Sequence, residues 1–274
     1  MVKIIGLLEN TTKSKDLKNR HGLSLYIQTE KHKILFDMGP DDLFLKNAKT
    51  LGVDPSQIDT AVISHGHVDH CGGLKYFLQN NQKAKIYIRP QALQNHYVKV
   101  LGIPFYAGIN KNLVQGERFV YADEFCVIDD EITLFSNVSG SFPLPKSDGN
   151  LFMKKDGKII ADDFCHEQNL LIFSGSKKIL VCGCAHAGIV NILDKAKTII
   201  GEYPTDVIGG FHLYEPTKKR YESDEYIDEV AAAINKTGAT FYTCHCTGIK
   251  AYQKMKKRLG DRLQYFGTGS EIEL

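Results

Sequence analysis

The chain has 274 residues, and 43% of them are hydrophobic, which is enough apolar side chain to bury a full core. Its 34 basic and 32 acidic residues leave a formal net charge of +2, so neither nucleic acid nor a membrane surface is an expected partner. No stretch has the composition of a linker, a repeat, a signal peptide or a membrane span. We therefore expect a cytoplasmic protein folded as a single domain over residues 1–274, with its seven cysteines present as thiols.

The first half of the chain alternates short apolar segments with amphipathic ones, which is typical of an α/β protein. Strands are predicted at residues 2–8, 23–29, 33–37, 59–64 and 85–88, and helices at residues 41–51 and 74–78, with a short helix opening at Pro90. Residues 102–149 are rich in glycine, proline and aromatic side chains, and only 117–120 and 132–135 resemble strands. We expect this stretch to form loops over the functional site, as a substrate lid would.

The second half contains strands that end next to a histidine and a glycine. Strands are predicted at residues 170–173, 178–182, 206–208 and 240–243, and helices at residues 189–200, 224–236 and 249–259. His186, His212 and His245 each follow one of these strands. Because sites form at the carboxyl ends of strands in α/β proteins, we expect the three histidines to lie at one rim of the fold.

Residues 60–74 read TAVISHGHVDHCGGL and hold His65, His67, Asp69 and His70 within six residues. Three imidazoles and a carboxylate crowded onto one turn are costly for a fold unless a metal ion neutralises and orders them. Neutral imidazole and carboxylate are ligands that zinc and related divalent ions accept. At the end of a strand His65 and His67 would point to the same side and bind one ion, whereas Asp69 and His70 would reach a second ion.

The sequence HGHVDH, placed after a strand and before a glycine-opened helix, resembles the signature of the metallo-β-lactamase superfamily. The resemblance implies a four-layered αββα sandwich with one or two divalent metal ions in the cleft between its sheets. Zinc is the expected ion, with iron or manganese as alternatives. In this family an aspartate supports the histidine loop from behind, and the matching residue here is Asp37.

An ion held by His65 and His67 needs a third protein ligand, and His186, His212 and His245 are all candidates. In the order of ligands that the resemblance implies, His186 follows the hairpin of the second half and His245 follows the last strand. His212 then lies on the intervening strand, where we expect it to face the substrate or to support a ligand rather than to bind metal.

One position departs from the family pattern. Dinuclear members carry a Gly-Asp pair whose carboxylate bridges both ions, and the corresponding pair here is Gly183-Cys184. The sequence leaves open whether a thiolate takes the bridging place or the site has no protein bridge. Cys182, Cys184, Cys244 and Cys246 form two Cys-x-Cys pairs that suit either core packing or a metal. Among the remaining histidines, His32 and His96 are expected at the surface and His166 is expected to be structural.

The ligand set predicts a metal-dependent hydrolase that activates water against an ester or phosphoester-like small molecule. Asp69 would bind metal and orient the nucleophile, and His212 would donate a proton to the leaving group. The motifs HGLS, LFDMG, SHGHVDHCGGL, CGCAHAGIVN, GGFHL and CHCTG together resemble a narrower group, the metallo-hydrolases related to dihydropterin-ribofuranosyl-aminobenzene-phosphate synthase.

Two other functions stay open. The first is the condensation that this narrower resemblance implies, on a phosphorylated and pterin-like substrate, with a pocket from Phe105, Tyr106, Phe142 and either Lys146 or Lys154. The second is a non-hydrolytic iron protein for redox chemistry or electron transfer, which the four cysteines near the site suggest. The sequence leaves the substrate open, and also whether the chain forms an oligomer.

Overall fold

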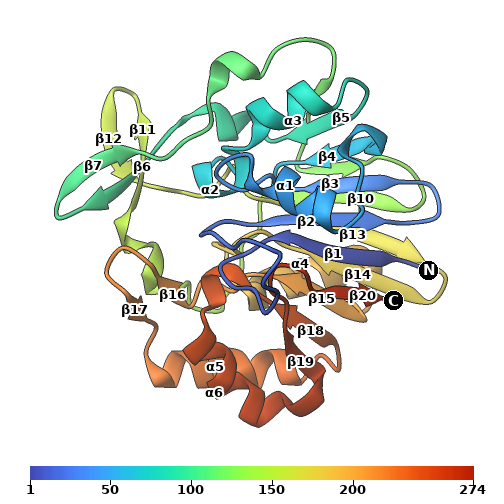
Figure 1. Cartoon of the computed structure of the whole chain (residues 1–274). Coiled ribbons are helices and arrows are strands. Elements are labelled where there is room, and N and C mark those ends of the chain that lie inside the picture. The colour runs from blue at the N-terminus through green and yellow to red at the C-terminus, as the bar shows by residue number, and fades with distance from the viewer.

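Two seven-stranded sheets pack face to face in the centre of the molecule, and helices cover their outer faces (Figure 1). The computed structural model describes all residues from 1 to 274. The order of the layers is helix, sheet, sheet and helix, which confirms the predicted four-layered α/β sandwich.

The strands of the two sheets come from both halves of the chain. The first sheet contains Lys3–Leu8 (β1), Ser24–Gln28 (β2), Lys33–Phe36 (β3), Thr60–Val62 (β4), Lys85–Ile88 (β5), Phe119–Tyr121 (β8) and Glu271–Glu273 (β20). The second contains Phe125–Val127 (β9), Ile132–Ser136 (β10), Gln168–Ser174 (β13), Lys177–Val181 (β14), Asp206–Gly209 (β15), Thr240–Thr243 (β18) and Leu263–Tyr265 (β19). Their spatial orders are β20-β1-β2-β3-β4-β5-β8 and β19-β18-β15-β14-β13-β10-β9.

Each boundary between layers has its own buried apolar cluster. Ile34 and Phe36 of β3 point between the sheets, together with Val181 of β14. Leu35, which lies between the first two, points to the opposite side and packs under the helices of the first sheet. Because both faces of these strands are covered, the strands are continuously apolar instead of alternating with polar residues.

Helices lie on both outer faces of the sandwich (Figure 1). On the first sheet they are Leu43–Thr50 (α1), Val68–Cys71 (α2) and Leu74–Asn80 (α3), and on the second they are Ile189–Ile200 (α4), Asp224–Asn235 (α5) and Ile249–Leu259 (α6). Short 3₁₀ helices occur at Pro55–Gln57, Pro90–Leu93, Lys111–Leu113, Lys146–Asn150, His245–Thr247 and Gly260–Arg262. The predicted bounds of β5, α4, α6 and β18 match the structure, and the other predicted elements differ mainly at their ends.

Glycine makes the turn from a histidine-bearing loop into a helix at two places. Gly188 precedes α4 with φ 80° and ψ 124°, and Gly248 precedes α6 with φ 73° and ψ 148°. Glycine adopts a positive φ of this kind without strain, whereas other residues are strained there. A Cβ atom at Gly248 would also lie 2.7 Å from the ring of Tyr221. Each glycine therefore allows its loop to end sharply, with the histidine held beside the first turn of the helix.

A separate four-stranded sheet extends from the body of the molecule, at the left of Figure 1. It consists of Asn95–Val100 (β6), Ile103–Tyr106 (β7), Leu151–Lys155 (β11) and Lys158–Ala161 (β12), in the order β12-β11-β6-β7. A small ribbon of Tyr214–Glu215 (β16) and Arg220–Tyr221 (β17) follows later in the chain. In residues 102–149 only two strands were predicted among loops, and the structure adds β7, β9 and the 3₁₀ helix Lys111–Leu113. All residues of β7 and β12 are exposed, so these strands have no buried face to give a periodic apolar signal.

The two ends of the chain meet at one edge of the first sheet. The amide of Val2 donates to the carbonyl of Leu274 at 2.9 Å, next to the pairing of β1 with β20 (Figure 1). None of the helices combines the length and the apolar character needed to cross a membrane.

Candidate metal centre

The loops that follow β4, β14, β15 and β18 meet at one rim of the two sheets and carry the predicted histidines. β4 runs parallel to both of its neighbours, and β14, β15 and β18 run parallel to one another, so within each sheet the carboxyl ends of these strands face the same way. Side chains from these loops line a cavity of about 420 Å³, among them His67, Asp69, His186, His212 and His245. The structure thus brings together residues that lie far apart in the sequence.

Three imidazoles form a first group: His65, His67 and His186. Their ring centroids are 4.7 Å apart for His65 and His67, 5.0 Å for His65 and His186, and 5.1 Å for His67 and His186. Nε2 of His65 and Nε2 of His186 are buried and have no hydrogen-bond partner. Buried nitrogen atoms without partners cost free energy, and a metal ion between the rings would satisfy them.

The opposite nitrogen atoms of His65 and His186 are held by oxygen atoms. Nδ1 of His65 lies 2.9 Å from Oγ of Ser64, which itself donates to Asp37 at 2.6 Å. Nδ1 of His186 lies 2.6 Å from Oδ1 of Asp148. Burial lowers the pKa of His186 to about 4, although Asp148 opposes this shift. Both imidazoles are therefore neutral near pH 7, with Nε2 as a free electron-pair donor.

A second group contains Asp69, His70 and His245. Nε2 of His70 lies 3.2 Å from Nε2 of His245, and Oδ2 of Asp69 lies 3.3 Å from Nε2 of His245 and 3.6 Å from Nε2 of His70. Ligands at tetrahedral positions around zinc, each about 2.0–2.1 Å from the ion, are about 3.3 Å from one another. The three donor atoms already have the spacing that one such ion requires.

Both Nε2 atoms of this second group carry lone pairs that face each other. Nδ1 of His70 donates to Oδ2 of Asp37 at 2.6 Å, and Nδ1 of His245 donates to Oδ1 of Asn10 at 2.9 Å. The amide of Gly22 donates to the same Oδ1 of Asn10, which fixes the orientation of that side chain. Two lone pairs at 3.2 Å, next to a carboxylate, require a cation or a proton between them. The donor set therefore fits a divalent metal ion.

The charge balance of this group also favours a cation. Burial lowers the pKa of His70, but the carboxylates of Asp37 and Asp69 outweigh burial and raise the pKa to about 9. In the absence of metal, the imidazole of His70 therefore binds a proton, and its positive charge balances the negative charge of the two carboxylates. A bound ion would supply that charge in its place.

Cys184 lies between the two groups. Its Sγ is 3.2 Å from Nε2 of His70, and it is also within metal-binding reach of His65 and His186 together, and of His245. This is the location expected for a residue that bridges two ions. Cys246 lies close by, where the amide of His212 donates to its Sγ at 3.3 Å. Cys184 and Cys246 therefore lie at the site, whereas Cys182 and Cys244 pack in the apolar clusters.

His212 lines the cavity next to the first group. Its ring centroid is 4.3 Å from that of His186, and its Nε2 lies 3.0 Å from the same Oδ1 of Asp148. Burial lowers the pKa of His212, but Asp148 outweighs burial and leaves the pKa well above its usual value. The side chain faces the cavity with a proton available, and whether it binds metal stays a prediction.

Four residues at the site have left-handed backbone although they are not glycine. They are Asp37 with φ 59°, Ala185 with φ 58°, His212 with φ 46° and His245 with φ 49°. Such conformations cost free energy and persist where the surrounding contacts fix them. Their occurrence together at this rim is typical of a functional site.

Several carboxylates that orient the site were missed from the sequence. Asp148 lies in the irregular stretch, and Glu167 accepts hydrogen bonds from the amides of His186 and Ala187 at 2.7 and 3.0 Å. Glu9 is buried and accepts a hydrogen bond from the amide of His245 at 2.6 Å. The signal available for Glu9 was a carboxylate placed directly after the apolar run Ile4–Leu8 of β1.

One expectation about the other histidines was wrong, and a second holds in part. His96 was expected at the surface but is buried, in contact with Asp162 and near His67. His32 is only partly exposed and lies between Asp59 and Asp129, at 3.1 and 2.6 Å. The expected pocket residues Phe105, Tyr106, Phe142, Lys146 and Lys154 do not line the cavity.

Comparison with known proteins identifies the family. The family model described as the metallo-beta-lactamase superfamily matches residues 17–224. The chain belongs to this superfamily. A metal-dependent hydrolase of the beta-lactamase superfamily has a solved structure that superposes with a TM-score of 0.86 at 28% identity, over 100% of this chain and 99% of that one. The confirmed fold and the buried groups of histidine, aspartate and cysteine agree with this membership.

Two relatives from Methanocaldococcus jannaschii match most of the chain. An uncharacterized protein is 29% identical over 258 residues, which cover 94% of each chain. The second relative is named 7,8-dihydropterin-6-methyl-4-(beta-D-ribofuranosyl)-aminobenzene-5'-phosphate synthase, and it is 28% identical over 271 residues, covering 93% of this chain and 90% of the other. These similarities confirm the narrower resemblance seen in the sequence motifs.

Proposed function

We propose that this member of the metallo-beta-lactamase superfamily is a metal-dependent hydrolase of small ester or phosphoester substrates. One observation carries the proposal. Four buried imidazoles, of His65, His70, His186 and His245, each have Nδ1 held by an oxygen atom and Nε2 directed at other donors of the same rim. Outer hydrogen bonds of this kind orient histidines that bind metal.

In this proposal two divalent ions bind, one to His65, His67 and His186 and the other to Asp69, His70 and His245. Zinc is the ion that suits the mixture of nitrogen, oxygen and sulfur donors, and iron or manganese are the alternatives. When bound, the ions lower the pKa of a water molecule and offset negative charge that develops on the substrate. Asp37, Asp148 and Asn10 keep the histidines in the orientation that binding needs.

The protein's own groups would then position the reactants. Asp69 is 22% exposed, so one edge of its carboxylate faces the cavity and would orient the attacking water. His212 also faces the cavity, and Asp148 favours its protonated form, which suits a donor to the leaving group. The proton would pass from a nitrogen of His212 to the departing oxygen.

The lining of the cavity indicates the substrate class. Away from the candidate ligands it combines apolar side chains with neutral polar ones and has no lysine or arginine; the apolar ones include Val68, Val98, Ala107 and Leu151, the polar ones are Ser147, Asn150 and Thr217, and His21 and Glu215 also line it. A phosphate group would therefore be held by the ions and backbone rather than by a cationic side chain. We infer a small substrate with an ester or phosphoester at the metal end and a largely uncharged body.

A synthase-like condensation is the second candidate, because a relative of 28% identity over 93% of this chain is named for such a reaction. It shares the metal centre but requires a second, pterin-like substrate. Fluorescence titration with a reduced pterin distinguishes the candidates: saturable binding would favour the condensation, and no binding would favour simple hydrolysis.

The first test is elemental analysis with an absorbance spectrum on protein purified without added metal. About two zinc or manganese ions per chain, without a visible band, would support the dinuclear hydrolase. Hydrolysis of a model phosphodiester or lactone should stop with a chelator and return with the metal. Full activity in the stripped protein would contradict the proposal, and iron with strong colour would favour the redox alternative.

A substitution tests the same centre without removing an entire side chain. Asp69→Asn should lower kcat/KM at least about 100-fold, because the carboxylate is lost from both the ligand set and the water position. Asp130→Asn is a matched control, because Asp130 is 77% exposed and contacts only Lys31. Equal activity of the two variants would remove Asp69 from the mechanism.

A further inference from the structure

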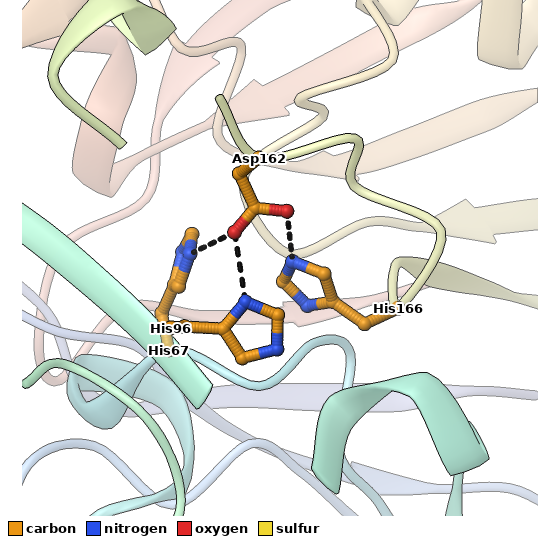
Figure 2. A group of neighbouring side chains, drawn as sticks. All are labelled: His67, His96, Asp162 and His166. Atoms are coloured by element: carbon orange, nitrogen blue, oxygen red, sulfur yellow. Dashed lines mark hydrogen bonds and ion pairs between the residues drawn. The ribbon is translucent and has the colours of Figure 1, made fainter. Parts of the chain in front are cut away.

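A second cluster of histidines surrounds one carboxylate behind His67. Figure 2 shows His67, His96 and His166 arranged around Asp162. Asp162, His96 and His166 are fully or almost fully buried, and His67 is the member that also lines the cavity. The residues come from different elements: His67 follows β4, His96 lies on β6, Asp162 follows β12 and His166 precedes β13. Such a cluster could hold a metal ion or could be a hydrogen-bond network, and the contacts of His166 decide between the two.

His166 presents a donor to Asp162. Its Nδ1 accepts a hydrogen bond from the amide of Gly66 at 2.8 Å, so this nitrogen carries no proton. The neutral ring must then carry its proton on Nε2, which lies 3.3 Å from Oδ1 of Asp162. An ion at Nε2 would turn the ring into an imidazolate. The cluster is therefore suited to hydrogen bonds and not to a further metal ion.

Asp162 gathers donors from several directions. Nδ1 of His96 donates to Oδ2 at 2.8 Å, and the amide of Phe164 donates to Oδ1 at 3.0 Å. Nε2 of His67 is directed at the same Oδ2, at 3.6 Å, and this buried nitrogen has no hydrogen-bond partner (Figure 2). Because a carboxylate oxygen faces this nitrogen, the proton of His67 is favoured on Nε2.

His67 thus differs from the other four histidines of the proposed centre. His65, His70, His186 and His245 are held at Nδ1 and direct Nε2 inward, whereas His67 meets its carboxylate through Nε2. We propose that Asp162 is a positioning residue that fixes the Nε2–H tautomer of His67 and leaves Nδ1 to bind the ion. His96 and His166 hold the carboxylate in place for this role. The inference rests on the metal centre proposed above.

The first test needs no metal. Nitrogen-15 NMR of the histidine rings in metal-free protein reports which nitrogen carries the proton, and His67→Gln assigns the signal of His67. The Nε2–H tautomer for His67 is the expected result. A dominant Nδ1–H tautomer would overturn the inference, even if the protein then bound two ions as proposed.

The second test compares Asp162→Asn with Asp163→Asn. The side chain of an asparagine at 162 has an NH₂ group, which would face imidazole N–H groups that are also donors. His67 has the longest contact with residue 162, so we expect its tautomer to change. Asp163 is the matched control, because it is the adjacent residue and bonds only the amide of Cys165 and Lys155. The affinity for the first ion should fall about 10- to 100-fold in Asp162→Asn and stay unchanged in Asp163→Asn.

Site-selective titration separates positioning from a general structural effect. Cobalt competition on Asp162→Asn should weaken the ion at His65, His67 and His186 and leave the ion at Asp69, His70 and His245 unaffected. Equal weakening of both ions, or of neither, would overturn the inference. Three ions per chain, falling to two in His96→Asn, would also overturn it, because the cluster would then be a metal site. Absence of any bound ion in the native protein would instead contradict the proposed function.

Discussion

Asp37 and His70 share a hydrogen bond of 2.6 Å, from Nδ1 of the imidazole to Oδ2 of the carboxylate, and neither side chain is exposed. The same Oδ2 accepts the hydroxyl of Ser64 at 2.6 Å, and that hydroxyl oxygen lies 2.9 Å from Nδ1 of His65. One buried carboxylate therefore orients a histidine of each proposed ion site. This relationship links the two sites through a residue that binds neither ion.

Asp37→Asn tests this link. Asparagine tolerates the left-handed backbone of Asp37, so the variant removes the charge without adding strain. We expect the affinities for both ions to fall about 10- to 100-fold, and the metal-free protein to lose about 1–3 kcal/mol of unfolding free energy. Isothermal titration with zinc and urea unfolding measure the two effects. An effect confined to one ion would show that the shared carboxylate does not couple the sites.

His212→Gln should separate proton donation from metal binding. The glutamine cannot donate a proton in the same way, so kcat should fall about 100-fold or more while two ions remain bound. Elemental analysis of the variant and its steady-state kinetics are the measurements. Loss of one ion per chain would instead make His212 a ligand. A leaving group that needs no proton, such as a nitrophenolate, should be hydrolysed almost as fast by the variant as by the native enzyme.

Two substitutions at Cys184 test the bridging position. Cys184→Ser removes the sulfur that lies 3.2 Å from His70, and we expect the second ion to dissociate more readily. Cys184→Asp introduces the carboxylate that the family pattern has at this position, and it should restore two-ion binding. Cobalt-substituted native protein should show a sulfur-to-cobalt charge-transfer band that both variants lack. If the charge-transfer band persists in Cys184→Ser, the sulfur bound to cobalt belongs to another cysteine, and Cys246 is then the candidate.

His32 should make the stability of the protein depend on pH. Burial lowers the pKa of His32, but the hydrogen bonds to Asp129 and Asp59 outweigh burial and raise the pKa above 6.5. Because the folded protein holds the proton more tightly, this contribution is complete below about pH 6.5 and is lost as the pH rises through the folded-state pKa.

Urea unfolding between about pH 6 and 9, with a chelator present, measures this effect. Native protein should lose unfolding free energy over this range, and His32→Gln should lose less, because the titrating group is absent. Asp130→Asn, a change at an exposed neighbour, should keep the native slope. Identical slopes in all three proteins would show that the His32 contacts do not contribute to stability.

The sequence predicted the parts of the molecule that have strong local signals. Helices α4 and α6 have clear apolar periodicity and end in glycine, and their predicted bounds match the structure. The strand-ending histidines were also predicted to gather at one rim, because parallel strands place their carboxyl ends together. The roles assigned to His65, His67, Asp69, His70, His186 and His245 stay predictions, as does the single domain over residues 1–274.

The supporting residues could not be predicted in the same way. Asp162 lies more than ninety residues from His67, and it reaches that histidine only because β12 and β6 belong to one extended sheet. The exposed strands of that sheet lack an apolar pattern, so neither the sheet nor its contact with the site is visible in the sequence. His96 was misjudged for the same reason, since its burial depends on that sheet.

The two groups of proposed ligands each draw on both large sheets. The loop after β4 belongs to the first sheet, while the loops after β14 and β18 belong to the second. Ions held as proposed would therefore cross-link the two sheets at this rim, whereas the paired ends of the chain, β1 and β20, join each other within the first sheet alone. Chelation should accordingly speed amide hydrogen exchange around His65, His186 and His245 while β1 and β20 keep their protection. The metal would then stabilise the packing of the two sheets as well as take part in the reaction.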